Sequence, residues 1–299
     1  MPCIVCDETS EAVVWKENGY EGRLCPCGTV YTSPEAAPGI IDPRLDNHSD
    51  IFYSRYALTK ARWVQRIRQS GRLLEIGCGQ GHFLRAAKSL GYSVAGVEPH
   101  PERARRIQDQ LGIEVRCSLL EDLEWQNASF DVVYHCDLLS HFPKPVQALR
   151  KMSSLLAPDG ILACEAGTLG AIHPLWYRWI GQLGFPQHRW LYSPKSLRRL
   201  FADAGMQILQ MQHFGLAPAV VLHRLFVMAS GLVRRIHRNS VSQERQGAAG
   251  TTVKRDVQGT ADAFYDVVDQ FLRYRIGAMA PRLGPATWWI AARRAVEVS

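Results

Sequence analysis

The middle of the chain alternates between short apolar runs, typical of buried strands, and longer amphipathic segments, typical of helices. An amphipathic helix is predicted first, over residues 51–69, with Tyr56, Trp63 and Val64 on its apolar face. The strands predicted after it are residues 72–76, 93–97, 113–117, 130–135 and 160–166, and the helices between them are residues 81–90, 101–111 and 145–156. Strands and helices in this order predict an α/β fold with a doubly wound parallel sheet covered by helices on both faces.

The pattern also divides the chain into segments. A helix over residues 194–204 leads into a strand over 206–214, and a further strand is predicted over 287–293. Between these two strands the pattern predicts helices over 217–237 and 261–280. We therefore expect a small N-terminal module (1–34), a linker (35–50), a core (51–214), a helical insertion (215–283) and a closing strand (284–299).

Composition adds limits on class and location. The chain has 299 residues, of which 46% are hydrophobic, and a formal net charge of +7 with a pI near 9.1. Its basic residues are spread over helical segments, so the charge is weak evidence for a nucleic acid or membrane partner. No apolar run is long enough to span a bilayer, and the N-terminus lacks the pattern of a secretion signal. We expect a cytoplasmic protein, with peripheral contact at the inner face of the membrane as an alternative.

Cysteines fall into two groups. Cys3, Cys6, Cys25 and Cys27 lie in two short-spaced pairs near the N-terminus, which is the layout of a zinc ribbon with four thiolate ligands. The second pair is one residue shorter than usual, so a disulfide, or a site completed by a histidine such as His48, stays open. Cys78, Cys117, Cys136 and Cys164 are scattered within or beside apolar runs and are expected to be reduced and buried.

Three glycines mark the turn after the first core strand. Gly77, Gly79 and Gly81 stand where the chain leaves the strand, which lets a ligand approach the backbone. Glu98 ends the next strand about 20 residues further on, as needed to bind ribose hydroxyls. A nicotinamide-binding turn would need a glycine where His82 stands, so the spacing favours S-adenosylmethionine.

The runs E-I-G-C-G-Q-G, G-V-E-P, S-F-D-V-V and L-L-A-P-D-G, in this order, resemble the class I S-adenosylmethionine-dependent methyltransferase superfamily. The resemblance covers roughly residues 72–214 and implies a seven-stranded Rossmann-like sheet whose last strand is antiparallel. It implies that Glu75 orders the glycine turn and that Glu98 binds ribose. The residues it implies for cofactor binding are Glu75, Gly77, Cys78, Gly79, Gly81, Glu98, Pro99, Ser118, Leu119, Leu120 and Cys136, of which Ser118, Leu119 and Leu120 would border the adenine.

Candidate catalytic residues lie in two segments. The same resemblance places His141 in the segment where a histidine faces the methyl-transfer cleft, while a helix cap or a core hydrogen bond is the alternative. His188 and Tyr192 lie in an aromatic-rich segment that resembles the acceptor-binding region of small-molecule members. Each is a candidate to position or deprotonate an acceptor, or else a buried polar group satisfied by backbone. His135, within a strand, is expected to pack.

Three functions follow from these residues. The leading hypothesis is methyl transfer to a small-molecule acceptor, sugar-containing or lipid-linked, with the insertion as a lid or a membrane contact. An rRNA or tRNA methyltransferase that uses the ribbon to recognise RNA is the second hypothesis. The third is a protein that binds the cofactor and docks partners without turnover.

Overall fold

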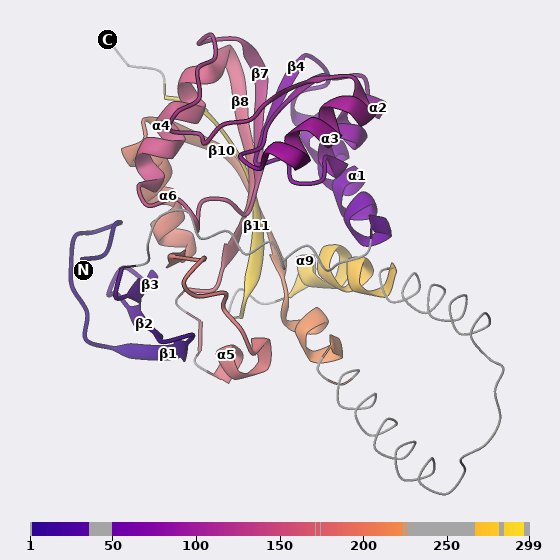
Figure 1. Ribbon diagram of the computed structural model, residues 1–299. Helices are drawn as coiled ribbons and strands as arrows, with labels where there is room; N and C mark the ends of the chain where they lie inside the picture. Colours follow the sequence, from indigo (N-terminus) through magenta and orange to yellow (C-terminus); the bar gives the residue numbers. More distant parts are fainter. Residues whose placement is uncertain are drawn as a thin grey trace, which may run out of the picture.

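A computed structural model describes residues 2–35, 50–170, 172–173, 175–223, 225, 267–280 and 284–295 of the chain (Figure 1). Its main feature is a seven-stranded sheet in the order β10-β11-β8-β7-β4-β5-β6. These strands are β4 (Arg72–Ile76), β5 (Ser93–Val97), β6 (Glu114–Arg116), β7 (Phe130–Cys136), β8 (Leu156–Thr168), β10 (Met206–Gly215) and β11 (Ala286–Arg294). β11 pairs antiparallel with both neighbours, whereas the pairs from β8 through β6 are parallel. The predicted doubly wound α/β sheet with an antiparallel last strand is confirmed.

Helices cover both faces of this sheet. α1 (Asp50–Ile67), α2 (His82–Ser89) and α3 (Pro101–Leu111) lie on one face, and α4 (Pro145–Leu155) and α6 (Pro194–Asp203) lie on the other (Figure 1). Each layer has its own buried cluster: Leu84, Trp63 and Val64 belong to the first, and Leu149, Leu197 and Phe201 to the second. Two apolar layers of this kind supply most of the stabilisation of such a domain.

The elements begin and end for local chemical reasons. Ser193 caps α6, because its hydroxyl accepts from the Ser196 N–H at 3.1 Å while the Ser196 hydroxyl accepts from the Ser193 N–H at 2.8 Å. Strand β8 starts at Leu156, four residues before the predicted start, because the chain becomes extended as soon as α4 ends. Strand β6 ends at Arg116, and Cys117 beyond it is exposed, so the expectation that this cysteine is buried was wrong.

A second, smaller sheet contains the N-terminal residues. It has the order β1-β2-β3-β9, from β1 (Val13–Glu17), β2 (Tyr20–Leu24), β3 (Val30–Ser33) and β9 (Trp190–Leu191). Its fourth strand comes from the segment between α5 (Leu175–Ile180) and α6. The N-terminal module is therefore continuous with the rest of the domain through the β3–β9 pairing.

The insertion leaves and returns at the carboxyl end of the parallel strands. Gly215 at the end of β10 pairs with Ala286 at the start of β11, and Ala286 pairs with Thr168 at the end of β8. Residues 217–223 are helical, as are residues 267–271, followed by the π-helical turn η2 (Leu272–Ile276) and α9 (Gly277–Met279). The remainder of the predicted helices, with Arg234 and Arg235, lies outside the described residues. No helix in the described ranges is long and apolar enough to cross a membrane.

His135 is the penultimate residue of β7 and is fully buried, as expected of a packing residue. Neither ring nitrogen has a hydrogen-bond partner among the described residues. Burial disfavours the charged ring and lowers the pKa of His135 to about 3. The folded protein therefore holds this ring neutral, whereas the unfolded chain protonates it at its ordinary pKa of about 6.5.

Acid should therefore destabilise the fold through His135. Because the unfolded state binds the extra proton, the free energy of unfolding falls as the pH drops from the unfolded pKa toward the folded one. We expect His135 to account for a loss of about 2 kcal/mol between pH 7.5 and pH 5. Urea unfolding at both pH values should show that this part of the loss disappears in His135→Leu and remains in the control His100→Leu, whose ring is exposed. An equal loss in wild type and His135→Leu would contradict the assignment.

Candidate active site

The glycine turn connects β4 to α2 and has the geometry the sequence predicted. Gly77, Gly79 and Gly81 have positive φ angles of 69°, 54° and 76°, a backbone region that only glycine adopts readily. A Cβ at Gly77 would lie 2.7 Å from Leu138 Cδ1, so no larger residue fits there. A Cβ at Gly79 would meet nothing within 4 Å. The turn is thus packed on its Leu138 side and open on its Gly79 side, where a ligand can approach the backbone.

Glu98, at the end of β5, is tied to this turn. It is buried, and its Oε2 accepts from the Gly79 N–H at 2.9 Å, while its Oε1 accepts from the His100 N–H at 3.1 Å. The structure therefore brings Glu98 and the glycines together, as predicted. Two carboxylate oxygens provide more acceptor sites than these two bonds use, so the carboxylate can still accept from a ligand hydroxyl.

Glu75 lies just before the turn and is buried with an unsatisfied oxygen. The Leu84 backbone N–H in the first turn of α2 acts on its carboxylate and favours the charged form, whereas burial opposes it. Its Oε2 has no partner among the described residues, and burial raises the pKa of Glu75 well above its ordinary value. A cationic ligand beside Glu75 would supply the missing partner. The ammonium group of S-adenosylmethionine fits this requirement.

The other predicted cofactor residues lie around the turn or at the strand ends. Cys78 is buried in the turn, and its Sγ would lie 2.9 Å from a Cβ at Gly96. Pro99 follows Glu98 and is half-buried, as is Cys136 at the end of β7. Of the three residues predicted to border the adenine, Leu120 is buried in the core and Leu119 is 51% exposed. Ser118 is half-buried, and its hydroxyl donates a hydrogen bond to the Leu119 carbonyl at 2.8 Å.

His141 and His188 lie together, although they come from different segments. Their ring centroids are 4.6 Å apart. His141 Nδ1 lies 3.1 Å from the Gln187 carbonyl oxygen, and His188 Nδ1 lies 2.8 Å from Ser140 Oγ. Burial, with His188 nearby, lowers the pKa of His141 to about 4. His141 is thus a neutral base at neutral pH.

The hydrogen bonds also define the tautomers. A carbonyl oxygen only accepts, so the Gln187 contact requires the proton of His141 on Nδ1. For a neutral His188 ring we assign the proton to Nδ1 as well, because the Ser140 hydroxyl, which donates to the Asp137 carbonyl at 3.3 Å, can then accept from it. With this assignment Nε2 carries the lone pair in both rings.

Tyr192 is the third predicted catalytic residue, and its surroundings differ. Its side chain is 1% exposed, and its hydroxyl donates to the Leu139 carbonyl at 3.0 Å. This is the arrangement of the alternative that the sequence left open, a buried polar group satisfied by backbone. Tyr192 holds the loop after β7 in place.

A buried ion pair at the carboxyl ends of the strands was missed by the sequence analysis. Lys60 Nζ on α1 lies 2.9 Å from Glu165 Oε2 on β8, with side-chain exposures of 12% and 16%. Lys60 also donates to Cys136 Sγ at 3.2 Å, and Trp289 Nε1 donates to Glu165 at 2.8 Å. Burial acts against the ammonium, but Cys136 and Glu165 raise the pKa of Lys60. The signal was present in the sequence, because Lys60 stands within the apolar stripe formed by Tyr56, Trp63 and Val64.

The four N-terminal cysteines converge. Their sulfur atoms all lie within 4.8 Å of one another, with Cys6 and Cys25 at 3.2 Å and Cys3 and Cys27 at 3.7 Å. All four are free thiols, and tetrahedral zinc thiolates have sulfur separations of about 3.8 Å. Burial raises the pKa of Cys3 to about 11, so a bound cation is needed to favour its thiolate. His48 lies outside the described residues.

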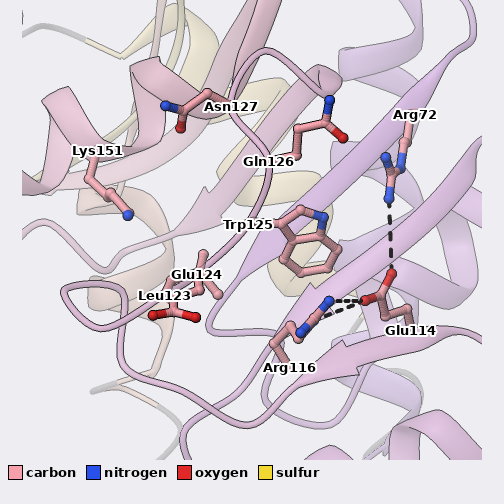
Figure 2. A pocket seen from close by; sticks show the side chains of 9 residues that line it. All are labelled: Arg72, Glu114, Arg116, Leu123, Glu124, Trp125, Gln126, Asn127 and Lys151. Carbon is pink, nitrogen blue, oxygen red and sulfur yellow. Dashed lines mark hydrogen bonds and ion pairs between the residues drawn. The ribbon is translucent and has the colours of Figure 1, made fainter.

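A separate polar hollow lies away from the turn (Figure 2). It has a volume of about 690 Å³ and includes Arg72, the first residue of β4, and Lys151 on α4. Figure 2 shows Arg72 and Arg116 reaching the same carboxylate of Glu114, with separations of 3.9 and 2.8 Å. Because the two guanidinium groups are already paired, the hollow is a surface charge network and not the site of the predicted chemistry.

The sheet order, the glycine turn and the acidic residue after β5 together define a Rossmann-like methyltransferase domain. The family described as Methyltransferase domain matches residues 50–211, more than half of the 299-residue chain. The chain belongs to this family.

Curated relatives support the same class, and a solved structure shares the fold. The ubiquinone biosynthesis O-methyltransferase of Xanthomonas axonopodis pv. citri is 33% identical over 150 residues, which are 46% of this chain and 63% of that protein. That of Cereibacter sphaeroides is 29% identical over 153 residues, 46% of this chain and 61% of that protein. The chain thus spans less than two thirds of these relatives. The structure of geranyl diphosphate methyltransferase with SAM matches with a TM-score of 0.50 at 17% identity, covering 81% of this chain and 85% of that one, which is a likeness of fold.

The buried Lys60–Glu165 pair yields a stability prediction. Removing one partner leaves an uncompensated buried charge, so Lys60→Met and Glu165→Leu should each lower the free energy of unfolding by about 3 to 5 kcal/mol. The double variant should be more stable than either single variant, because no charge is left unpaired. Urea unfolding of the three variants measures this coupling. Additive losses in the double variant would show that the two charges do not stabilise each other.

Proposed function

We propose that this protein transfers a methyl group from S-adenosylmethionine to a hydroxyl group of a small molecule. The observation that carries the proposal is the pair of adjacent histidines, His141 and His188, in the loop and segment beside the glycine turn. Leu138 of the same loop packs on Gly77, so the histidine loop and the glycine turn adjoin. The names of the curated relatives, which are O-methyltransferases, support a hydroxyl acceptor.

The proposed cofactor site uses the turn and the strand ends. Gly77, Gly79 and Gly81 would pass the cofactor close to the backbone, Glu98 would hold the ribose, and Glu75 would accept from the ammonium group. Ser118, Leu119 and Leu120 would border the adenine, and Cys78, Pro99 and Cys136 would line the pocket. When bound, the cofactor supplies an electrophilic methyl group on a sulfonium ion.

The proposed chemistry needs few catalytic groups from the protein. Methyl transfer is an in-line displacement, so the site must align the acceptor oxygen, exclude water and remove the hydroxyl proton. His188 or His141 would receive that proton at Nε2. Burial and the adjacent second ring disfavour a positive charge on His141, whose pKa of about 4 makes it the weaker choice near neutral pH, so His188 is the first candidate to test.

The helical insertion is the proposed acceptor-side wall. It starts and ends beside the carboxyl ends of β8 and β10, which is the edge where the histidines and the glycine turn lie. A sugar-containing or lipid-linked acceptor, with peripheral contact at the inner face of the membrane, is the finer form of this proposal. We place the protein in the cytoplasm.

The RNA alternative receives no support from the ribbon. Within the described part of the ribbon, Lys16 and Arg23 are already paired: Lys16 lies 2.9 Å from Glu21, and Arg23 lies 3.1 Å from both Glu11 and Glu21. A phosphate-binding surface needs cations that can release counterions. Partner docking without turnover stays the third hypothesis, because an intact glycine turn would bind the cofactor in either case.

We also propose that Cys3, Cys6, Cys25 and Cys27 hold one structural Zn²⁺. The module has only short strands, and a metal replaces the core that so few residues cannot build. The sulfur separations described above match a tetrahedral site.

Glu98 provides the test of the cofactor site. Glu98→Ala removes a charged acceptor for the ribose hydroxyls and also the bond to Gly79, so S-adenosylhomocysteine should bind more weakly by about 2 to 4 kcal/mol. Calorimetry measures the dissociation constant, with Glu102→Ala on the exposed side of α3 as the control. The assignment of Glu98 fails if both variants bind like wild type.

Metal analysis tests the ribbon. Protein purified without chelator should contain about one zinc per chain, and the double substitution Cys6→Ser and Cys25→Ser should abolish it. Cys117→Ser and Cys164→Ser, which lie outside the cluster, should retain the metal. A disulfide and no metal in the wild-type protein would overturn the zinc site.

The acceptor class is tested by labelled methyl transfer. Wild type would be incubated with radiolabelled S-adenosylmethionine and, separately, a catechol, a sugar nucleotide, a hydroxylated lipid and tRNA. We expect label in a hydroxyl-bearing small molecule and a loss of about 10²- to 10⁴-fold in kcat with His188→Gln or His141→Gln. Label in tRNA alone would replace the proposal with the RNA alternative, and the absence of label from every acceptor, despite tight binding of S-adenosylhomocysteine, would favour partner docking.

A further inference from the structure

The turn between β1 and β2 reaches the segment that contains His188. Glu17 Oε2 accepts from the Leu183 N–H at 2.8 Å, and Glu17 Oε1 accepts from the Gly184 N–H at 3.3 Å. The next residue, Asn18, donates from its amide to the Phe185 carbonyl at 2.7 Å. Two residues of the N-terminal module thus bind three consecutive residues of the acceptor-side segment.

The Glu17 carboxylate is itself held in place. Trp15 Nε1 donates to Glu17 Oε2 at 3.1 Å, and the Trp15 ring lies against the buried Tyr177 with ring centroids 6.0 Å apart. Two successive backbone N–H groups that point at one carboxylate form an anion-binding concavity, and Gly184 adopts the positive φ of 79° that such a turn uses. The contact is therefore specific in geometry and in charge.

Gly184 transmits this contact to His188. A Cβ at Gly184 would lie 2.4 Å from His188 Cδ2, so the imidazole packs directly on the glycine backbone. The His188 N–H also donates to the Gly184 carbonyl at 3.0 Å. A shift of Gly184 would move His188 away from Ser140, whose hydroxyl holds Nδ1.

The module holds the other end of the same segment as well. The Thr32 N–H donates to the Arg189 carbonyl at 3.1 Å, and Tyr31 pairs with Trp190 between β3 and β9. The Ser193 hydroxyl donates to the carbonyl of Cys27, one of the four converging cysteines, at 3.1 Å. His188 lies between these two sets of contacts, three residues after Phe185 and directly before Arg189.

We propose that Glu17 is a positioning residue for His188, and that the N-terminal module supports the acceptor side of the site. Glu17 touches neither cofactor nor acceptor in this proposal; it sets the backbone on which the His188 ring rests. The inference rests on the proposed function only for the role of His188 as a base. The geometry of the ring is measurable without any acceptor.

The test is the tautomer of His188, read from the ¹⁵N resonances of its imidazole in the full-length protein with zinc bound. At alkaline pH, where an imidazole is neutral, wild type should show the Nδ1–H tautomer, because Ser140 accepts that proton. Glu17→Ala should lose this signature as the freed ring samples both tautomers, and Ser140→Ala should lose it in the same way. Glu21→Gln, on the same hairpin but paired only with Lys16 and Arg23, should keep the wild-type resonances. Glu17→Gln, which keeps one acceptor oxygen, serves if Glu17→Ala does not fold.

Two controls separate this inference from the others. Zinc content and the dissociation constant of S-adenosylhomocysteine should stay within about twofold of wild type in Glu17→Ala, since neither site contacts Glu17. An unchanged Nδ1–H signature in a folded Glu17→Ala variant would overturn the positioning role, whatever the activity. A failure of wild type to bind S-adenosylhomocysteine would overturn the proposed function and leave the tautomer result intact.

Discussion

The hydrogen bond from the Gly79 N–H to the Glu98 carboxylate is the interaction on which the rest of the site depends. It joins the ends of two adjacent parallel strands, β4 and β5, and it does so in a buried setting where a charged acceptor has few alternatives. The turn can form this hydrogen bond because its three glycines adopt positive φ angles, which other residues adopt less readily. The same turn starts α2, and the buried Glu75 carboxylate lies in the strand that leads into it. Sheet, turn and helix are thereby fixed relative to one another at the edge where a ligand can approach.

The other side of that edge is assembled from segments far apart in the sequence. The loop after β7 brings Ser140 and His141, the segment after α5 brings His188, and the N-terminal module contacts that segment at both ends. Figure 1 shows the N-terminal strands, α5 and α9 all at the end of the sheet opposite the C-terminus. Because β11 is antiparallel to β8, that end is where the parallel strands finish. A module that looks separable in the sequence is therefore part of the wall of the site.

Periodicity predicted the central strands β4, β5, β7 and β8 because each contains a buried apolar run. It also predicted the glycine turn and Glu98, since both depend on spacing along the chain and not on distant contacts. Strand β9 has two residues, too few to show a period, and its partner β3 lies more than a hundred residues away. The positioning role proposed for Glu17 could not be predicted from its neighbours in the sequence, because the partners of its carboxylate are the distant N–H groups of Leu183 and Gly184. Lys60 and Glu165 could have been found, since each interrupts an apolar pattern at a position that faces the core.

A crystal structure with S-adenosylhomocysteine tests the central claim most directly. The account predicts that the ligand occupies the edge formed by Gly77, Gly79 and Gly81, with its ribose hydroxyls on Glu98, its ammonium group on Glu75 and its sulfur facing the histidine pair. Density for the ligand elsewhere on the protein, or an empty glycine turn at saturating ligand, would contradict it.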